Sequence, residues 1–509
     1  MGLLLKAAVS FVLYLVTKAV YNLTLHPLSK YPGPKAWIVS RIPYLVCLNA
    51  GQLPFRVKKL HDEYGPVVRV SANELSINDP RAWKDIFNRR DMLRPPQWGA
   101  RPPGVEAHNI ISAPASSHAR FRKALTPAFS EKSVKDYEPT VRSFLDKLLT
   151  QLDNLIAKGG KSAVVDMVEW TNFATFDIIG ELSWSKSYEC LDSGSGHAFM
   201  SVLLHFQAVC VGASISYYPW LTAFVAGITP KSAFQLLENI FKDGHERLQA
   251  RMKLQQSEHP DLISHIVDHN TKSNPEDKLT DDEIEQNVLA IIVGGSETLT
   301  TTFAGAFHYL LADPPKLARL TKEIRSSFAS ASEITANSAA KLPYLNAVLE
   351  EALRLCPPIP DMLRRDVPKG APTTIAGRVI PADTTVSVSC YSMFKSDEHF
   401  ASAETFEPER FLNKESRTGD ANASALSHND LSAFYPFSLG PHNCLGQPLA
   451  KLEMRLLMSL FLYRYNVTVP AGEPLRKWTD QKIYWTWEKQ PLKVEISRGN
   501  RSVSFASHL

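Results

Sequence analysis

The sequence lacks an excess of charge of either sign. Lys and Arg number 56 against 52 Asp and Glu, which gives a formal net charge of +4 over 509 residues. Proteins dedicated to nucleic acid carry a strongly basic domain or stripe, and the sequence has neither a basic nor an acidic tail. We therefore expect no nucleic-acid partner.

Cysteines are few and scattered. The six cysteines form no CxxC pair and no closely spaced group; they are Cys47, Cys190, Cys210, Cys356, Cys390 and Cys444. Zinc sites and disulfide scaffolds need such groups. The pattern excludes both classes and indicates reduced thiols in a cytosolic setting.

Long Gly/Ser linkers, low-complexity runs and internal repeats are also missing after about Ser29. The hydrophobic content is 44%, enough for a deep core in a chain of this length. No Gly-rich dinucleotide fingerprint is present. We therefore predict one large domain over residues 29–509, without a nucleotide-binding domain of its own.

The first residues form an apolar segment, LLLKAAVSFVLYLVTKAVYNLTL, from Leu3 to Leu25. About 20 apolar residues span the hydrocarbon core of a bilayer. Lys6 and Lys18 lie towards its ends, where their stems can reach the headgroups. A cleaved signal peptide and a buried helix are the alternatives, but the proline-rich stretch HPLSKYPGPK follows in place of a small-residue cleavage site. We expect a transmembrane anchor over residues 1–28.

The flanks of this segment predict its orientation. Lys30, Lys35 and Arg41 follow it, whereas Lys6 alone precedes its apolar centre. Cytoplasmic flanks carry the excess of Lys and Arg. The bulk of the chain should therefore face the cytosol.

Hydrophobic periodicity in the body predicts a mainly helical α+β fold with small sheets. The stretch from Leu279 to Pro315 begins with a capping box, Thr280 to Glu283, and ends at two prolines, which predicts a helix of about 33 residues. Residues 116–130, 343–356 and the segment after Cys444 also have helical patterns. Alternation over residues 67–77 and 374–392 predicts strands.

Cys444 lies in FSLGPHNCLGQPLA, between Gly440 and Gly446 and just before a helical stretch. A thiolate that binds iron is stabilised by backbone N–H groups turned towards its sulfur and by a helix N-terminus. Glycines allow such a turn and the close approach of a flat cofactor. Taken alone, the motif fits a buried, inert cysteine better, because free Cys packs as a small hydrophobe.

Two further pairs stand on predicted helices. Glu351 and Arg354 are three residues apart and share a helix face, and Arg410 in FEPERF offers a further charge. Glu297 and Thr298 follow two glycines in the middle of the longest helix. They could relay protons to a small molecule, although Thr298 could equally bond a carbonyl one turn earlier and bend the helix.

The order of these patterns carries more information than each pattern alone. A PGP neck, His118-x-x-x-Arg122, GGSET, E-x-x-R, PERF and F-x-x-G-x-x-x-C-x-G follow one another along the chain. Together they closely resemble the cytochrome P450 family over essentially the whole chain. The neck and residues 118–139 are similar to the microsomal fungal members that modify secondary metabolites, including the trichothecene hydroxylases.

The resemblance implies a cytochrome P450 fold and a haem b cofactor. Cys444 would be the axial ligand of the iron, within a loop shaped by Phe437, Gly440 and Gly446. The haem propionates would meet basic side chains at positions matching His118, Arg122, Arg365 and His442. Many relatives have tryptophan and arginine where this chain has His118 and His442, so both can supply hydrogen bonds in place of full charge. Arg364, beside Arg365, is the competing candidate.

The resemblance also implies roles for the two helical pairs. Glu351, Arg354 and Arg410 would form a structural triad that supports the segment before the cysteine loop. Glu297 and Thr298 would be the acid and alcohol that deliver protons for dioxygen activation. Gly294 stands where many relatives have alanine, which would widen the groove over the iron.

The implied activity is that of a membrane-anchored monooxygenase of the endoplasmic reticulum, single-pass and facing the cytosol. It would insert one oxygen atom of O2 into a lipophilic small molecule, with electrons from an NADPH-cytochrome P450 reductase. Arg120, Lys123 and Lys451 are candidate docking residues for that partner. Two alternatives stay open: an oxygen-independent haem-thiolate rearrangement enzyme, and a noncatalytic membrane-tethered haem or lipid-binding protein.

The substrate pocket implied by the resemblance is rich in aromatic residues. The residues that would line it and favour a bulky apolar ligand are Trp98, Phe206, Tyr217, Trp220, Ile291, Met362 and Trp485. His205 and Asp361 could fix a polar group of that ligand, although a satisfied structural residue is the alternative for each.

Overall fold

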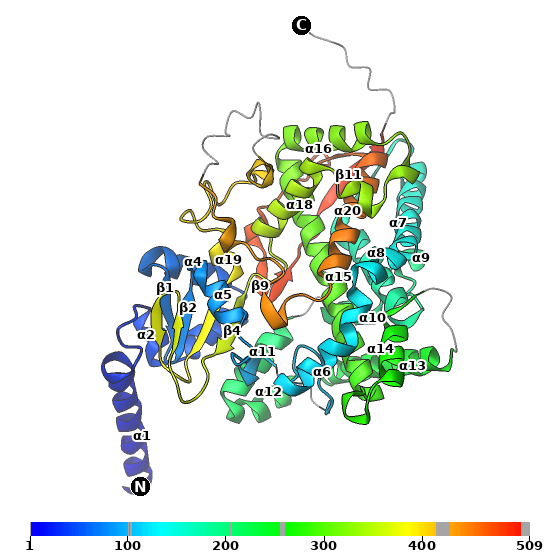
Figure 1. Ribbon diagram of the computed structural model, residues 1–509. Helices are drawn as coiled ribbons and strands as arrows, with labels where there is room; N and C mark the ends of the chain where they lie inside the picture. Colours follow the sequence, from blue (N-terminus) through cyan, green and yellow to red (C-terminus); the bar gives the residue numbers. More distant parts are fainter. Residues whose placement is uncertain are drawn as a thin grey trace.

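Helices make up most of the body, and a small sheet lies at one side of it (Figure 1). The structure is a computed structural model that describes residues 2–99, 101, 104–203, 206–254, 260–413 and 428–499. Helix α1 (Gly2–Val20) projects away from the body beside that sheet (Figure 1). The expected mainly α fold with small sheets is confirmed.

Helix α1 has no buried residue, and it continues into a short π-helical turn, η1 (Tyr21–Leu25). The span from Gly2 to Leu25 is long and apolar enough to cross a bilayer. Asn22 is the first buried residue among those described, and it donates from Nδ2 to the carbonyl of Ile38 at 3.3 Å. Arg69 in turn donates to the carbonyl of Asn22 at 2.7 Å. The division between residues 28 and 29 stays a prediction, but the neck is fixed to the body before that point.

Helix α15 (Asp281–Ala312) crosses the centre of the molecule (Figure 1). The capping box predicted from the sequence is present, because the Thr280 hydroxyl accepts from the N–H of Glu283 and the Glu283 carboxylate accepts from the N–H of Thr280. A Cβ at Gly295 would lie 2.9 Å from Ile179, so glycine there lets α15 pack closely against α8 (Met167–Trp184). The prediction of a long buried central helix is confirmed.

The other helices surround α15 and α8. They are α2 (Lys35–Val39), α3 (Ile42–Asn49), α4 (Leu53–Tyr64), α5 (Arg81–Phe87), α6 (Ala115–Leu125), α7 (Glu131–Gly159), α9 (Cys190–Ser193), α10 (Ala198–Leu203), α11 (Gln207–Tyr217), α12 (Thr222–Ile228), α13 (Lys231–Lys253), α14 (Leu262–Lys272), α16 (Pro314–Ser327), α17 (Ala336–Ala339), α18 (Pro343–Leu355), α19 (Cys390–Phe394) and α20 (Gln447–Arg464). The helical segments expected after residues 115, 343 and 444 correspond to α6, α18 and α20.

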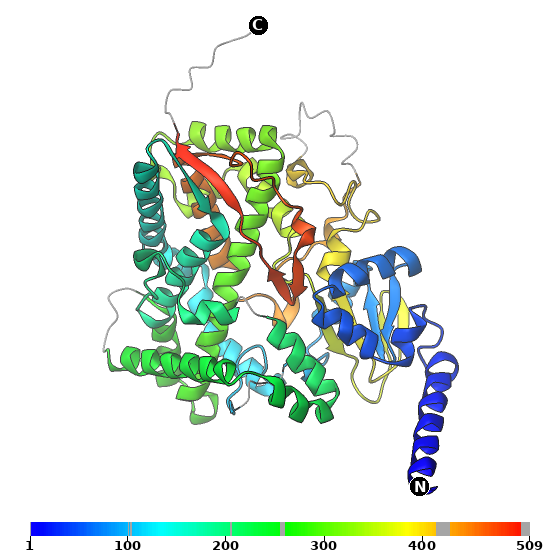
Figure 2. The ribbon, with the colours of Figure 1, turned by 180° about the vertical axis from the view of Figure 1, so that it is seen from behind.

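The strands form four small sheets among the described residues. The largest has the order β1-β2-β7-β4, in which β2 and β7 are parallel and the other pairs antiparallel. Figure 2, which views the molecule from behind, shows β11 running beside β3. The strands are β1 (Val67–Ser71), β2 (Glu74–Ile77), β3 (Ser162–Asp166), β4 (Met362–Asp366), β5 (Thr373–Ile375), β6 (Arg378–Ile380), β7 (Thr385–Ser389), β8 (Tyr465–Thr468), β9 (Lys482–Tyr484), β10 (Thr486–Glu488) and β11 (Lys493–Arg498).

One predicted strand segment is too long. Alternation was expected to continue to residue 392, but β7 ends at Ser389 and α19 begins at Cys390. The Ser389 hydroxyl accepts from the N–H of Ser392, so it caps the helix and ends the strand. Ser389, which continued the alternating pattern in the sequence, is thus the N-cap of α19.

Candidate active site

Cys444 lies in a tight loop just before α20. Its N–H donates to the carbonyl of Phe437 at 2.8 Å, which closes the loop on itself. Of the six cysteines, Cys444 alone is exposed. The loop therefore presents one sulfur, whereas four other cysteines are buried in the core and Cys47 is half-buried.

Cys444 has accessible surface, yet its sulfur lies deep within the fold and close to hydrogen-bond donors. Burial raises the pKa of the thiol, whereas the N–H groups of Gly446 and Gln447 and the charge of Arg122 lower it. The two N–H groups belong to the first turn of α20, where the positive end of the helix dipole also lies. The expectation that backbone N–H groups turn towards the sulfur agrees with this geometry.

The two glycines of the loop have different surroundings. Gly440 has φ +69°, and a Cβ there would lie 2.0 Å from the carbonyl oxygen of Phe87, so only glycine fits. A Cβ at Gly446 would meet only Phe129, at 3.9 Å. No atom of the described residues therefore fills the space at Gly446, and a flat cofactor could approach the backbone closely there.

Glu351, Arg354 and Arg410 form a fully buried ion cluster. Both nitrogens of the Arg354 fork donate to Glu351 at 2.7 Å, and Nε of Arg410 donates to the same carboxylate at 3.1 Å. Arg354 also donates to the carbonyls of Phe394, Ala403 and Thr405. The cluster thus ties α18 to the segment that precedes the cysteine loop.

Cationic and imidazole side chains gather on one side of the cysteine loop. The rings of His118 and His442 lie 4.0 Å apart, and Arg94, Arg122 and Arg365 act on both through their charge. Burial and these charges lower the pKa of His118 to about 4 and that of His442 to about 3. Both imidazoles are therefore neutral near pH 7 in this chain and can donate N–H hydrogen bonds.

Arg365, and not Arg364, belongs to this group. Burial and the charge of Arg94 lower the pKa of Arg365 to about 9. Arg364 instead pairs with Glu74 at 3.1 Å and with Asp361 at 3.3 Å. Arg94 also belongs to this group, although its position in the loop after α5 gave no signal of this role in the sequence.

Arg122 reaches the cysteine loop directly. Its guanidinium donates to the carbonyl oxygen of Asn443 at 2.6 Å and also to the side-chain oxygen of Asn443. His118, Arg122 and His442 line a cavity of about 670 Å³ between α6 and the loop. The predicted residues are thus brought together around the edge of the loop.

The predicted acid and alcohol on α15 point in different directions. The Thr298 hydroxyl donates to the carbonyl of Gly294 at 2.7 Å, as in the purely structural alternative. Glu297 is buried and paired with Lys489, which also lies 3.3 Å from the hydroxyl of Thr301. A Cβ at Gly294 would meet nothing within 4 Å, so the helix surface there is open.

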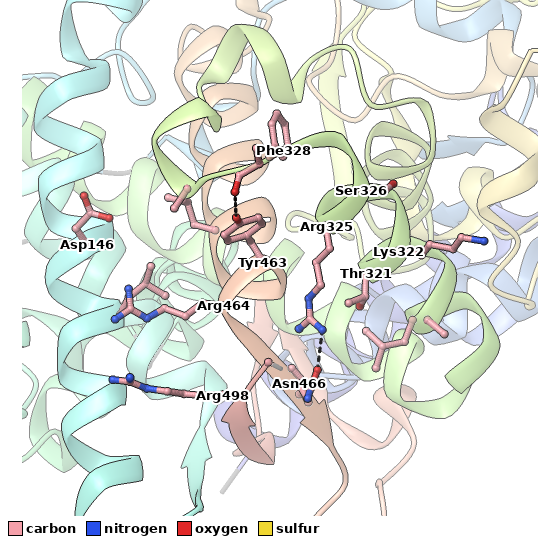
Figure 3. A pocket seen from close by; sticks show the side chains of 18 of the residues that line it. Asp146, Thr321, Lys322, Arg325, Ser326, Phe328, Tyr463, Arg464, Asn466 and Arg498 are labelled. Carbon is pink, nitrogen blue, oxygen red and sulfur yellow. Dashed lines mark hydrogen bonds between the residues drawn. The ribbon is translucent and has the colours of Figure 1, made fainter. Parts of the chain in front are cut away.

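A larger cavity of about 970 Å³ lies elsewhere, between α16, α20 and β8 (Figure 3). Its basic residue Arg325 donates to the side-chain oxygen of Asn466 at 2.9 Å and to two backbone carbonyls. Tyr463 donates to the carbonyl of Ala329 at 3.1 Å. None of the predicted site residues lines this cavity, so its size does not mark the active site.

The sequence profile of one family, Cytochrome P450, matches residues 32–496. The chain belongs to the cytochrome P450 family. The P450 monooxygenase lcsI of Purpureocillium lilacinum is 36% identical over 95% of this chain and 92% of its own length. The trichothecene C-15 hydroxylase of Fusarium sporotrichioides is 32% identical over 95% of this chain and 96% of its own length. The averantin hydroxylase of Dothistroma septosporum is 32% identical over 96% of this chain and 90% of its own length.

The protein is accordingly a P450 monooxygenase, an oxidoreductase that uses haem iron. Among its described residues, no group of three or more His, Cys, Asp or Glu side chains is placed to hold a metal ion. A single exposed thiol suits an iron whose four equatorial ligands come from a porphyrin. The residues of this P450 therefore fit a haem.

The candidate docking residues of the P450 are all paired. Arg120 donates to Glu283 at 2.8 Å, and Lys123 pairs with Asp277 at 2.7 Å. Lys451 lies 3.7 Å from Glu350. Their charges are thus partly compensated, and their role in docking stays a prediction.

Asp361 and Trp98, which were expected to contact substrate, both contact Arg364. Asp361 is buried and pairs with Arg364, which agrees with the structural alternative. Arg364 also lies over the ring of Trp98, with 3.7 Å between the guanidinium carbon and the ring centre. Phe206 and Trp485 pack together with ring centres 5.9 Å apart. His205 lies outside the described residues.

Proposed function

We propose that this P450 binds haem b through Cys444 and hydroxylates, or otherwise oxidises, a lipophilic secondary metabolite. The observation that carries the proposal is the single exposed thiol of Cys444, held beside two N–H groups at the start of α20. When bound, a thiolate-ligated haem activates dioxygen, because electron donation by the thiolate favours cleavage of the O–O bond.

The basic group around the cysteine loop would hold the two propionates. Arg365 and Arg94 would provide positive charge at a buried position, and His118 and His442 would provide imidazole N–H donors. Paired anions would relieve the mutual repulsion of these cations. Arg122 would keep the loop in place through Asn443.

The α15 residues would handle protons. The hydroxyl of Thr298 lies at an open part of the helix, where it can orient a water molecule. Glu297 is the next acid along the chain; burial raises its pKa, while the charge and hydrogen bond of Lys489 lower it, and a carboxyl group held between these effects can take up and release a proton. Gly294 would leave space for the substrate beside them.

Electrons would come from an NADPH-cytochrome P450 reductase. The support is the family membership, together with the missing dinucleotide fingerprint in the sequence. O2 would be the oxidant and the source of the inserted oxygen atom.

The enzyme would be anchored in the membrane of the endoplasmic reticulum by α1, with its body in the cytosol. Helix α1 is apolar and has no buried residue. Trp220, Phe224 and Ile228, in and next to α12, are 72%, 64% and 64% exposed. Both ribbon views place α12 at the lower side of the body, the side towards which α1 extends (Figures 1 and 2). An apolar surface on this side would lie against the same bilayer.

The substrate would be a bulky apolar metabolite. The relatives named above act, by their names, on trichothecenes and on averantin. Phe206 and Trp485 pack against each other in this chain, and such aromatic residues favour an apolar ligand.

Microsomes that contain the full-length chain and a reductase test this function. They are incubated with metabolites of the producing organism under ¹⁸O2, and products are followed by mass spectrometry. The proposal predicts a product heavier by one ¹⁸O atom that requires NADPH and is lost in Cys444→Ser. Product formation without O2 or reductase would instead establish the rearrangement enzyme. Haem binding without any product from the metabolite pool would favour the noncatalytic alternative.

A further inference from the structure

The buried partner of Glu297 comes from the far end of the chain. Lys489 follows β10, and its ammonium group donates to Oε1 of Glu297 on α15. The side chain of Lys489 is 0% exposed and that of Glu297 is 4% exposed. Burying two charges is unfavourable unless they are paired, so this contact ties the carboxylate to one position.

The helix geometry separates this pair from Thr298. Thr301 lies four residues after Glu297 and shares its face of α15, and its hydroxyl is 3.3 Å from Nζ of Lys489. Thr298 is one residue on, which turns its side chain by about 100°. The carboxylate of Glu297 therefore faces Lys489, whereas the Thr298 hydroxyl faces the open surface beside Gly294.

The protonation of Glu297 depends on Lys489. Burial raises the pKa of Glu297, and the charge and hydrogen bond of Lys489 lower it. No other charged group among the described residues contributes to the shift. Two opposed effects thus act on one carboxyl, and Lys489 supplies the one that favours the ionised form.

A cavity lies beside the segment that follows Lys489. Gln490, next to Lys489 in the chain, lines a cavity of about 590 Å³ together with Trp478 and Gln481. The N–H of Gln490 donates to the side-chain oxygen of Gln481 at 2.7 Å. The indole N–H of Trp478 is buried and has no acceptor among the described residues. Such polar groups at a cavity of this size can hold water.

We propose that Lys489 is a positioning residue of the proton relay. It holds the Glu297 carboxylate turned away from Thr298 until the carboxylate takes up a proton from the side of Gln490. The neutral acid then leaves the ammonium group and gives its proton to a water molecule at Thr298. Afterwards it returns to Lys489 as a carboxylate, while Lys489 keeps its three protons throughout. This inference rests on the proposed monooxygenase function.

The first test follows the carboxyl group itself. Infrared difference spectra of the full-length holoenzyme over a pH titration report the protonated-carboxyl band of Glu297, assigned by its loss in Glu297→Gln. In Lys489→Met the band should persist to a pH at least one unit higher than in the wild type, because only the effect of burial remains. Lys489→Arg keeps the charge and should retain the wild-type titration. Lys272→Met, which removes the exposed partner of Asp268, is the matched control and should also leave it unchanged.

The second test measures coupling, the ratio of product formed to NADPH consumed. Lys489→Met should shift the pH profile of coupling, whereas Glu297→Gln and the double variant Glu297→Gln/Lys489→Met should have the same coupling, because Lys489 acts only through Glu297. An unchanged carboxyl titration in Lys489→Met, or additive losses in the double variant, would overturn the proposal.

Folding is controlled by the carbon-monoxide spectrum and haem content of each variant. Lys489→Met alone can fail to bind haem, because it leaves Glu297 as an unpaired buried charge. Normal haem content in Glu297→Gln/Lys489→Met, which has no such charge, then supports a role of Lys489 through the charge of Glu297. A double variant that fails in the same way shows a packing role and overturns the proposal. A normal infrared titration in a wild-type protein that oxidises no substrate would refute the proposed function but not the Glu297–Lys489 coupling.

Discussion

Glu453→Gln should stabilise the protein at alkaline pH and not at acidic pH. Glu453 lies in α20 and is buried. Burial is the only cause that shifts its pKa, which rises from 4.5 to about 8. The folded chain therefore keeps a neutral carboxyl group where the unfolded chain has an ionised one.

The sign and size of the effect follow from this shift. Between pH 4.5 and about 8 the unfolded state binds fewer protons than the folded state, so the free energy of unfolding falls as the pH rises. Each pH unit costs about 1.4 kcal/mol, which amounts to about 5 kcal/mol over the whole interval. Glutamine has no such proton to lose, so the variant should escape this loss.

The assay is the apparent melting temperature of the full-length, detergent-solubilised holoenzyme at pH 5 and pH 8.5. The Tm of the variant minus the Tm of the wild type should be several degrees larger at pH 8.5 than at pH 5. The reason is that about 1 kcal/mol moves Tm by about 2–4 °C in domains of 150–250 residues, and by less in larger ones. Glu276→Gln, at an exposed turn, is the control and should show no such difference. An equal offset of Glu453→Gln at both pH values would refute the reasoning.

Three further variants test the cysteine loop, its support and the relay. Arg354→Lys keeps the charge, but the three donors of lysine cannot replace the five bonds that Arg354 makes to Glu351 and three carbonyls. A loss of about 1–3 kcal/mol is expected for each acceptor left unpaired, seen as lost haem content, and normal content would contradict it. Gly440→Ala should abolish the thiolate spectrum, because its Cβ would lie 2.0 Å from a carbonyl oxygen. Gly370→Ala, also at positive φ but with no atom within 4 Å of the new Cβ, should keep that spectrum. Equal effects of the two variants would show that φ alone matters. Thr298→Ala should raise peroxide release relative to product, and Thr298→Ser should restore coupling; unchanged coupling in the alanine variant would remove Thr298 from the relay.

Local patterns allowed much of this structure to be predicted. The capping box at Thr280 and the prolines after Ala312 mark the ends of α15 because these signals act on the backbone within one turn. Glu351 and Arg354 share a helix face for the same local reason. The loop of Cys444 was recognisable because Gly440 must be glycine in its strained turn.

Contacts between distant segments could not be predicted in this way. Lys489 is 192 residues from Glu297, and no periodicity links a lysine after β10 to an acid in α15. Arg94 joins the basic group through the path of its loop, and the pairing of Arg364 with Glu74 spans 290 residues. Tertiary packing alone brings these side chains together, so the distinction between Arg364 and Arg365 needed the structure.

The absorption spectrum of the reduced, carbon-monoxide-bound protein tests the central claim most directly. Full-length chain that ligates haem iron through Cys444 should give the long-wavelength Soret band of a thiolate-ligated haem, and Cys444→Ser should lose that band. An imidazole-like Soret position in the wild-type protein, with His118 or His442 as the nearest imidazoles, would contradict the assignment of Cys444 as the iron ligand.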